Sequence, residues 1–370
     1  MYASFQLVAD PIGDAAAELL AQAPGTRRLL EAGLRRGPGA RDPEPLQALL
    51  DEAWTVPAWV DFPRMLPGAR LQQRLGRLGL MILGAWGLVN GYHSAPAVKP
   101  LMFTGQLDVM ARRRLAETSH YVLLATADDG LRPGRPGWEA SVRVRLMHSA
   151  VRRMIRGGAG AGQPFDVAAW GEPANQADLA GTLVEFSGFI ILGARRLGIP
   201  VTTDEAEGLV HLWRYAGRLN GVHPRLLEEF SDAARLEHFA HLIKLIQPGP
   251  DDDSRALTHA MRHTVLEGAQ TPAERRMAAF LLRFHDGLSW ELNVDTVAAD
   301  LEVPHRGWRH VVRAVRPVLG AVHGLGHLVP GWEPRMRQQA RAAAERDVAQ
   351  MLAGHGPDFQ ARRVRSATSH

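Results

Sequence analysis

The stretch Trp138–Arg156, WEASVRVRLMHSAVRRMIR, decides the fold of this chain. His148 lies on its apolar face, while Arg145, Arg152 and Arg156 take another face. The residues of the apolar face recur at three- and four-residue steps, the period of an α-helix, and are Val144, Met147, Val151 and Ile155. The pattern predicts a long helix that points a titratable imidazole toward the protein interior.

A second predicted helix precedes this one and carries the polar cluster Arg114-Leu-Ala-Glu117-Thr118. Thr118 stands thirty residues before His148, and turn signals at Asp129-Gly130 and Arg132-Pro133-Gly134 separate the two helices. We therefore expect an antiparallel pair of helices. Such a pair can place an imidazole and a polar cluster on the two sides of a flat cofactor.

Composition limits the class of protein. The chain has 370 residues with 46% hydrophobic and 22% charged residues, which is typical of a soluble globular protein. It contains no cysteine, which excludes disulfides, cysteine-ligated zinc, iron–sulfur clusters and thiolate-ligated haem. The net charge is only +4, and the scattered arginines are typical of solvated helix faces, so no nucleic-acid partner is expected.

Helical periodicity dominates and no run of alternating β-branched residues occurs, so the predicted fold class is all-α. We expect one domain over residues 1–356, with a core at about 52–246, two short helices before it within residues 10–50, and a disordered tail at 357–370. The breakers and acidic run at 247–254 precede a C-terminal helical cap at about 255–353. Its predicted helices lie near 255–267, 271–287, 294–302, 305–324 and 333–353.

The longest apolar run, Leu78–Val89, has twelve residues, which is too few to span a bilayer. It predicts a buried, closely packed helix, and no membrane span is expected. The amino terminus, MYASFQ, shows no basic region, apolar core or twin arginine of an export signal. The expected location is the cytoplasm.

Several motifs together carry a family resemblance. The spacing of Arg114 and Thr118, the loop Gly130-Leu-Arg-Pro-Gly134 and the segment Val142–Arg152 resemble the latex clearing protein (rubber oxygenase) family. This family includes the oxygenase that trims the prenyl chain in mycophenolic acid biosynthesis. The resemblance covers roughly residues 50–230 and continues more weakly to about 340. Further matching segments are Val56–Asp61, Asn90–Tyr92, Lys99–Gly105, Trp170–Gln176, Leu212–Arg214 and Gly221-Val222.

The resemblance implies a b-type haem in an all-helical, globin-like core. His148 matches the proximal iron ligand, Arg114 matches an arginine that supports the proximal side or a propionate, and Thr118 matches a pocket residue near the distal face. A single histidine ligand leaves the sixth position open for dioxygen. Without the family motifs, His148 would be read as an ordinary core histidine. His93 and His120 are further candidates for the pocket.

Two positions depart from the family pattern. Glu117 stands where the family has a lysine that can cap the iron, and the only lysines of the chain are Lys99 and Lys244. The family's carboxylate on the preceding segment also has no counterpart, because residues 94–107 contain no Asp or Glu. Glu117 is therefore the candidate distal acid–base group, with Thr118 as a hydrogen-bond donor and Arg114 as a third catalytic candidate. The ordinary alternative for Glu117 is a solvated or capping carboxylate.

Other constellations suggest competing functions. Residues 294–316 resemble a helix-turn-helix with a basic second helix, which is the basis of an alternative reading as a DNA-binding or other binding protein. His259 and His263 have the one-turn spacing of a metal clamp but no third ligand is indicated. The Glu117-x-x-His120 pair of a di-iron bundle would need a second pair, and Glu302-x-x-His305 is interrupted by Pro304.

The sequence thus favours a haem b-dependent oxygenase that uses dioxygen on a small apolar substrate, such as an isoprenoid, polyene or natural-product intermediate. His148 is the expected metal ligand and, with Arg114 and Thr118, the expected cofactor-binding set.

Overall fold

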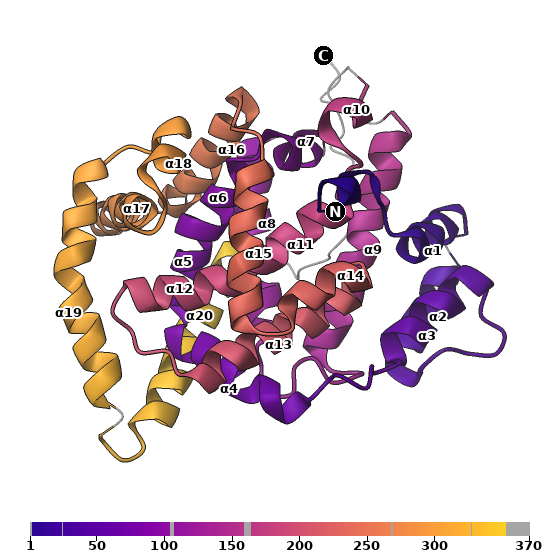
Figure 1. The fold of residues 1–370 in the computed structure, drawn as a ribbon, viewed down its shortest axis with the longest axis horizontal. Coiled ribbons are helices and arrows are strands. Elements are labelled where there is room, and N and C mark those ends of the chain that lie inside the picture. The colour runs from indigo at the N-terminus through magenta and orange to yellow at the C-terminus, as the bar shows by residue number, and fades with distance from the viewer. Residues whose placement is uncertain are drawn as a thin grey trace.

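The computed structural model describes residues 2–23, 25–103, 107–158, 164–267, 269–326 and 328–352, and for residues 107–110 the backbone alone. Within these ranges all regular structure is helical, so the all-α prediction is confirmed. The tail predicted to be disordered lies outside the described residues, as does most of the glycine-rich stretch after Gly158. Figure 1 shows the N-terminal helices on one flank of a central bundle and α17–α19 on the opposite flank.

The N-terminal flank holds three helices rather than the expected two: α1 (Pro11–Gln22), α2 (Thr26–Arg36) and α3 (Glu44–Trp54). The prediction was wrong because breaker residues separate this region twice, at Pro24-Gly25 and at residues 37–39. The carboxylate of Asp10 caps α1 by accepting a hydrogen bond from the Gly13 amide, with Pro11 at the first helical position.

The central bundle is built around α4 (Phe62–Leu75), α8 (Leu107–Ala125), α9 (Pro136–Arg156), α11 (Gln176–Phe186) and α13 (Thr203–Leu219). Helices α4 and α13 cross closely because Gly68 and Gly208 have no side chain at the crossing. A Cβ on Gly68 would lie 2.0 Å from the Leu209 nitrogen. The largest fully buried aromatic side chains lie in this bundle or border it: Trp138, Trp213, Tyr215 and Phe230.

The apolar run Leu78–Val89 is helical and mostly buried, as predicted, but it is not one regular helix. It comprises α5 (Arg77–Ile82), the π-helical turn η2 (Leu83–Leu88) and the start of α6 (Val89–Tyr92). π-Helical turns are rare and occur often at functional sites. The remaining helices between α6 and the C-terminal region are α7 (Ala95–Phe103), α10 (Val167–Trp170), α12 (Gly188–Arg196), α14 (Pro224–Leu227) and α15 (Ala233–Ile246).

The C-terminal helices follow the predicted order: α16 (Asp252–His263), α17 (Pro272–Leu292), α18 (Asp295–Asp300), α19 (Arg309–Gly326) and α20 (Trp332–Leu352). α20 returns to pack on α4 and α8, while α17 packs on α19 and on the π-helical turn. Among the described residues one helical stretch, Gln176–Arg196, is long and apolar enough to cross a membrane. Its apolar window is 67% buried inside the protein and it contains the break between α11 and α12, so it is a core segment.

Candidate histidine site

Helices α8 and α9 form the predicted antiparallel hairpin, and one contact fixes their register. The hydroxyl groups of Tyr121 and Ser141 lie 3.0 Å apart. Arg114 stands seven residues before Tyr121, and His148 stands seven residues after Ser141. Seven residues are two helical turns, so both residues keep the orientation of the contacting pair. The hairpin therefore places Arg114 and His148 at the same level on facing sides of the two helices.

His148 is enclosed by protein and yet accessible. Burial, with a smaller contribution from the positive charge of Arg152, lowers the pKa of His148 to about 4. The side chain is nevertheless only half-buried, so part of it remains accessible. Its buried Nδ1 atom has no hydrogen-bond partner among the described residues. An unpaired polar atom in the interior is costly, and a neutral imidazole is the form that binds a metal.

Two buried ion pairs fix α9 against α1. The guanidinium of Arg145 donates to Asp10 at 2.6 and 2.8 Å, and the guanidinium of Arg152 donates to Asp14 at 2.8 Å. We expected the arginines of the chain to be mostly solvated, and for Arg145 and Arg152 this was wrong. Their partners come from a helix more than 130 residues away in sequence. Both arginines flank His148 by about one turn, so the pairs hold the orientation of its helix face.

The three predicted residues on α8 differ in their surroundings. Arg114 is half-buried, and both of its terminal nitrogens donate to the Leu101 carbonyl at 3.2 Å. Burial lowers the pKa of Arg114. Thr118, one turn further along the same face, is half-buried, and its hydroxyl has no partner in the described part of the chain. Glu117 lies on the neighbouring face, where its carboxylate accepts a hydrogen bond from Arg113 at 2.9 Å.

The two further histidine candidates lie away from this face. His93 contacts Asp300 of α18 at 3.0 Å. His120 is half-buried, and its nearest charge is Glu345 of α20. Neither contact brings the imidazole toward His148.

A pair of acidic residues on α11 was missed by the sequence analysis. Burial raises the pKa of Asp178 to about 7, although the Asn175 amide donates a hydrogen bond to it at 2.8 Å. Burial, followed by the charge of Asp178, raises the pKa of Glu185 well above its ordinary value. The two are seven residues apart and share one face of an otherwise apolar helix. This spacing was the signal that could have revealed them.

Glu185 lies against the start of α6. A Cβ on Gly91 would be 2.3 Å from its Oε1 atom, so any larger residue would have to displace the carboxylate. The negative charge of Glu185 adds to burial in raising the pKa of Tyr92, and Arg114 opposes this effect. Glu185 has no ion pair or hydrogen bond with any described residue, although its surroundings would penalise a lone charge. An unpaired carboxylate of this kind marks a candidate functional site.

Five side chains of this region have a pKa shifted mainly by burial and yet keep some accessible surface. We call these five side chains together the chamber: Tyr92, Arg114, His148, Asp178 and Glu185. Four different helices supply them, namely α6, α8, α9 and α11. The chamber therefore combines one neutral imidazole, one cation and two carboxyl groups that burial keeps protonated to higher pH.

The donor set of the chamber fits a haem. Among the described ranges no group of three or more His, Asp or Glu side chains could hold a metal ion. A haem brings most of its iron ligands with it and needs only one or two from the protein. The imidazole of His148 could bind the iron of such a group, and Arg114 at the same level would suit a propionate carboxylate.

The histidine pair and the helix-turn-helix-like segment make ordinary contacts within the protein. The rings of His259 and His263 are 4.0 Å apart, and Nδ1 of His263 contacts the His259 carbonyl oxygen. In the helix-turn-helix-like segment, Arg309 bonds Asp295 at 2.9 Å and Arg313 bonds Glu291 at 2.8 Å. The basic face of that segment is thus engaged within the protein, and the DNA-binding alternative is not favoured.

The fold and the site together define an all-helical protein with an enclosed histidine centre. The chain belongs to the family described as ER-bound oxygenase mpaB/B'/Rubber oxygenase, catalytic domain, which matches residues 73–329. This confirms the family resemblance seen in the sequence, and it makes the chain a member of an oxygenase family.

Two known proteins show the extent of the similarity. The chain is 23% identical to the Rubber oxygenase of Streptomyces sp. (strain K30) over 234 residues, which is 61% of this chain and 54% of that protein. The match thus spans about half the length of the curated relative. The solved structure of latex clearing protein LCP in the closed state matches with a TM-score of 0.67 at 18% identity, covering 92% of this chain and 91% of that one. This second likeness shows a shared fold.

Proposed function

We propose that the protein is a haem b-dependent oxygenase that uses dioxygen on a small apolar substrate of the isoprenoid, polyene or natural-product type. The reaction would cleave a carbon–carbon double bond or hydroxylate an activated C–H bond. The observation that carries the proposal is His148, an enclosed, neutral imidazole at the level of Arg114 in the α8–α9 hairpin. Membership of an oxygenase family supports it.

The roles of the binding residues follow from their chemistry. Haem b, when bound, supplies the iron that activates dioxygen. His148 would be its protein ligand, because its lowered pKa keeps the imidazole neutral throughout the physiological range. Arg114 would pair with a propionate, and the free hydroxyl of Thr118 would donate a hydrogen bond within the pocket. Met147 and Val151 flank His148 on the same half-buried stripe and suit an apolar substrate.

Two carboxylates compete for the role of acid–base group. Glu117 occupies the position of the family's lysine but already pairs with Arg113. Glu185 has no such partner among the described residues, and its raised pKa lets it keep a proton to higher pH than an ordinary glutamate. We therefore assign proton transfer to Glu185 rather than to Glu117. We also propose a cytoplasmic location and a small-molecule partner.

Absorption spectroscopy of the purified protein tests the proposal. A Soret band, with haem b extracted as the pyridine complex, is the expected result for protein purified with cofactor or reconstituted with haemin. The variant His148→Ala should keep its helical circular dichroism and lose the bound haem. His120→Ala is a matched control, because His120 is directed toward α20, and it should retain the haem. A protein that stays colourless after reconstitution would overturn the assignment.

A further inference from the structure

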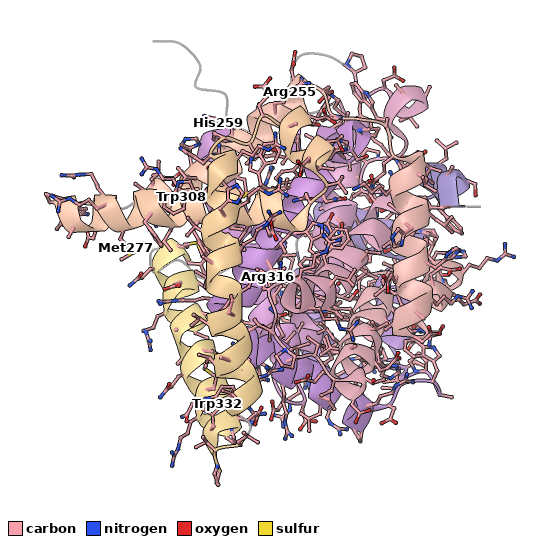
Figure 2. The ribbon with its side chains drawn as sticks, turned by 60° about the vertical axis from the view of Figure 1, so that its left-hand side comes forward. Arg255, His259, Met277, Trp308, Arg316 and Trp332 are labelled. Atoms are coloured by element: carbon pink, nitrogen blue, oxygen red, sulfur yellow. The ribbon has the colours of Figure 1, made fainter. Side chains whose placement is uncertain are left out.

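Helix α19 presents an apolar face to solvent. Val318 and Leu325 are 60% and 63% exposed, and Leu328 just beyond the helix is 78% exposed. Figure 1 places α19 along the outer edge of the molecule, and Figure 2 turns this flank toward the viewer. The remaining exposed apolar side chains of this stretch are Val311, Ala314, Pro317, Ala321, Val322 and Val329. We call this set, from Val311 to Val329, the α19 stripe.

The other faces of α19 are already engaged with the protein. Val312 and His323 are buried, and Leu319 packs against the core. The side chains of Arg313 and Arg316 reach Glu291 of α17 at 2.8 and 3.4 Å. The helix is therefore apolar on two sides, and Arg313 and Arg316, which share the single carboxylate of Glu291, lie between these sides. A helix with this pattern is normally covered on both apolar sides, and among the residues that the structure describes nothing covers the α19 stripe.

The apolar surface extends onto the N-terminal half of α17. Met277 is 58% exposed and Phe280 is 47% exposed. The rings of Phe280 and Trp308 lie in edge contact at 5.5 Å, which joins this part to the beginning of α19. Figure 2 marks Met277, Trp308 and Arg316 on this flank. Two neighbouring helices thus contribute to one surface, which is a larger target than a single amphipathic helix.

The charge around the stripe is positive. Residues 303–332 contain no Asp or Glu. Four arginines at the start of α19, residues 306, 309, 313 and 316, share only two carboxylates, Asp295 and Glu291. An excess of two positive charges therefore remains beside the apolar surface. Arg276 and Arg283 on α17 are exposed as well and lie within one turn of Phe280.

We propose that the α19 stripe docks on the surface of an anionic lipid bilayer. An apolar face bordered by arginines that outnumber the neighbouring carboxylates is the pattern of helices that lie in the membrane interface. A second copy of the chain would bring the same excess of positive charge against itself, whereas anionic headgroups neutralise it. The proposal rests on the proposed function for its purpose, since an apolar substrate dissolves in the bilayer. Its test does not require activity or haem.

Vesicle co-sedimentation of the full chain measures this docking. The probes are vesicles of phosphatidylcholine alone and of phosphatidylcholine mixed with phosphatidylglycerol. We expect binding to the anionic vesicles, weaker binding to neutral ones, and weaker binding to anionic vesicles at high salt because salt screens the charges. Leu325→Ser and Val318→Ser should each reduce the partition coefficient about tenfold, since each removes apolar surface from the interface.

Leu7→Ser is the matched control, because Leu7 is 63% exposed like Leu325 but lies in the N-terminal 3₁₀-helix η1 (Tyr2–Leu7). It should bind vesicles like the wild type, and circular dichroism should show that all variants are folded. Two results would overturn the proposal. One is wild-type protein that does not bind anionic vesicles. The other is a dimer in light scattering that Leu325→Ser converts to a monomer, which would show that the stripe joins two copies.

Discussion

Replacing Asp178 by Asn should stabilise the haem-free protein, and the gain should depend on pH. Burial raises the pKa of Asp178 from its ordinary value of 3.8 to about 7. In the unfolded chain the carboxyl titrates near its ordinary value. Protonated Asp178 therefore makes its full contribution to the free energy of unfolding below about pH 3.8. This contribution is lost as the pH rises through about 7, because the buried carboxyl must then carry a charge. Asparagine resembles the protonated acid in shape but carries no charge at any pH.

The magnitude follows from the two pKa values. A tenfold change in a proton equilibrium corresponds to about 1.4 kcal/mol. The shift in the pKa of Asp178 from 3.8 to about 7 therefore lowers the free energy of unfolding by about 4 kcal/mol above neutral pH. This is an upper bound, because water that enters the chamber solvates the charge. The advantage of Asp178→Asn in the free energy of unfolding should grow by about 2 to 3 kcal/mol between pH 5 and pH 8.

Urea unfolding at the two pH values measures this difference. Asp204→Asn is the control, because Asp204 is exposed in the first turn of α13, and its effect should be small at both pH values. An equal effect of Asp178→Asn at pH 5 and pH 8 would show that no charge is buried at this position. The chamber would then lack one of the two carboxyl groups assigned to it.

Three further predictions concern the site and the basic helix. The resting haem protein should be five-coordinate or water-bound and should bind imidazole and carbon monoxide, whereas a low-spin spectrum with two nitrogen ligands would contradict the open site at His148. Glu185→Gln should lower turnover while haem content and carbon monoxide binding persist; a larger loss in Glu117→Gln, measured in parallel, would reverse the assignment of the acid–base group. Duplex DNA should show no saturable binding at physiological salt in a fluorescence anisotropy titration, because Arg309 and Arg313 are paired with carboxylates of the protein. Tight, salt-sensitive binding that Arg309→Ala abolishes would contradict this.

Local periodicity and breakers were sufficient to predict much of this molecule. The stripe around His148 predicted α9, and the turn signals at Asp129-Gly130 and Arg132-Pro133-Gly134 predicted that α8 and α9 form a hairpin. Because a short connection makes consecutive helices antiparallel neighbours, the sequence alone also placed Arg114 opposite His148. These inferences succeed since they need only the helical repeat and a turn, both of which are local properties of the chain.

Contacts between distant segments could be found only in the tertiary structure. Arg145 and Arg152 are buried because Asp10 and Asp14 approach them from a helix at the other end of the sequence. The seven-residue spacing of Asp178 and Glu185 shows that they share a face of α11, but only the packing of the helices shows that this face is buried. Likewise, the sequence shows that α19 is apolar on two sides, but packing decides that Val312 is buried while Val318 and Leu325 remain exposed to solvent. Burial depends on which segments meet, and that is determined by the whole chain rather than by any window of it.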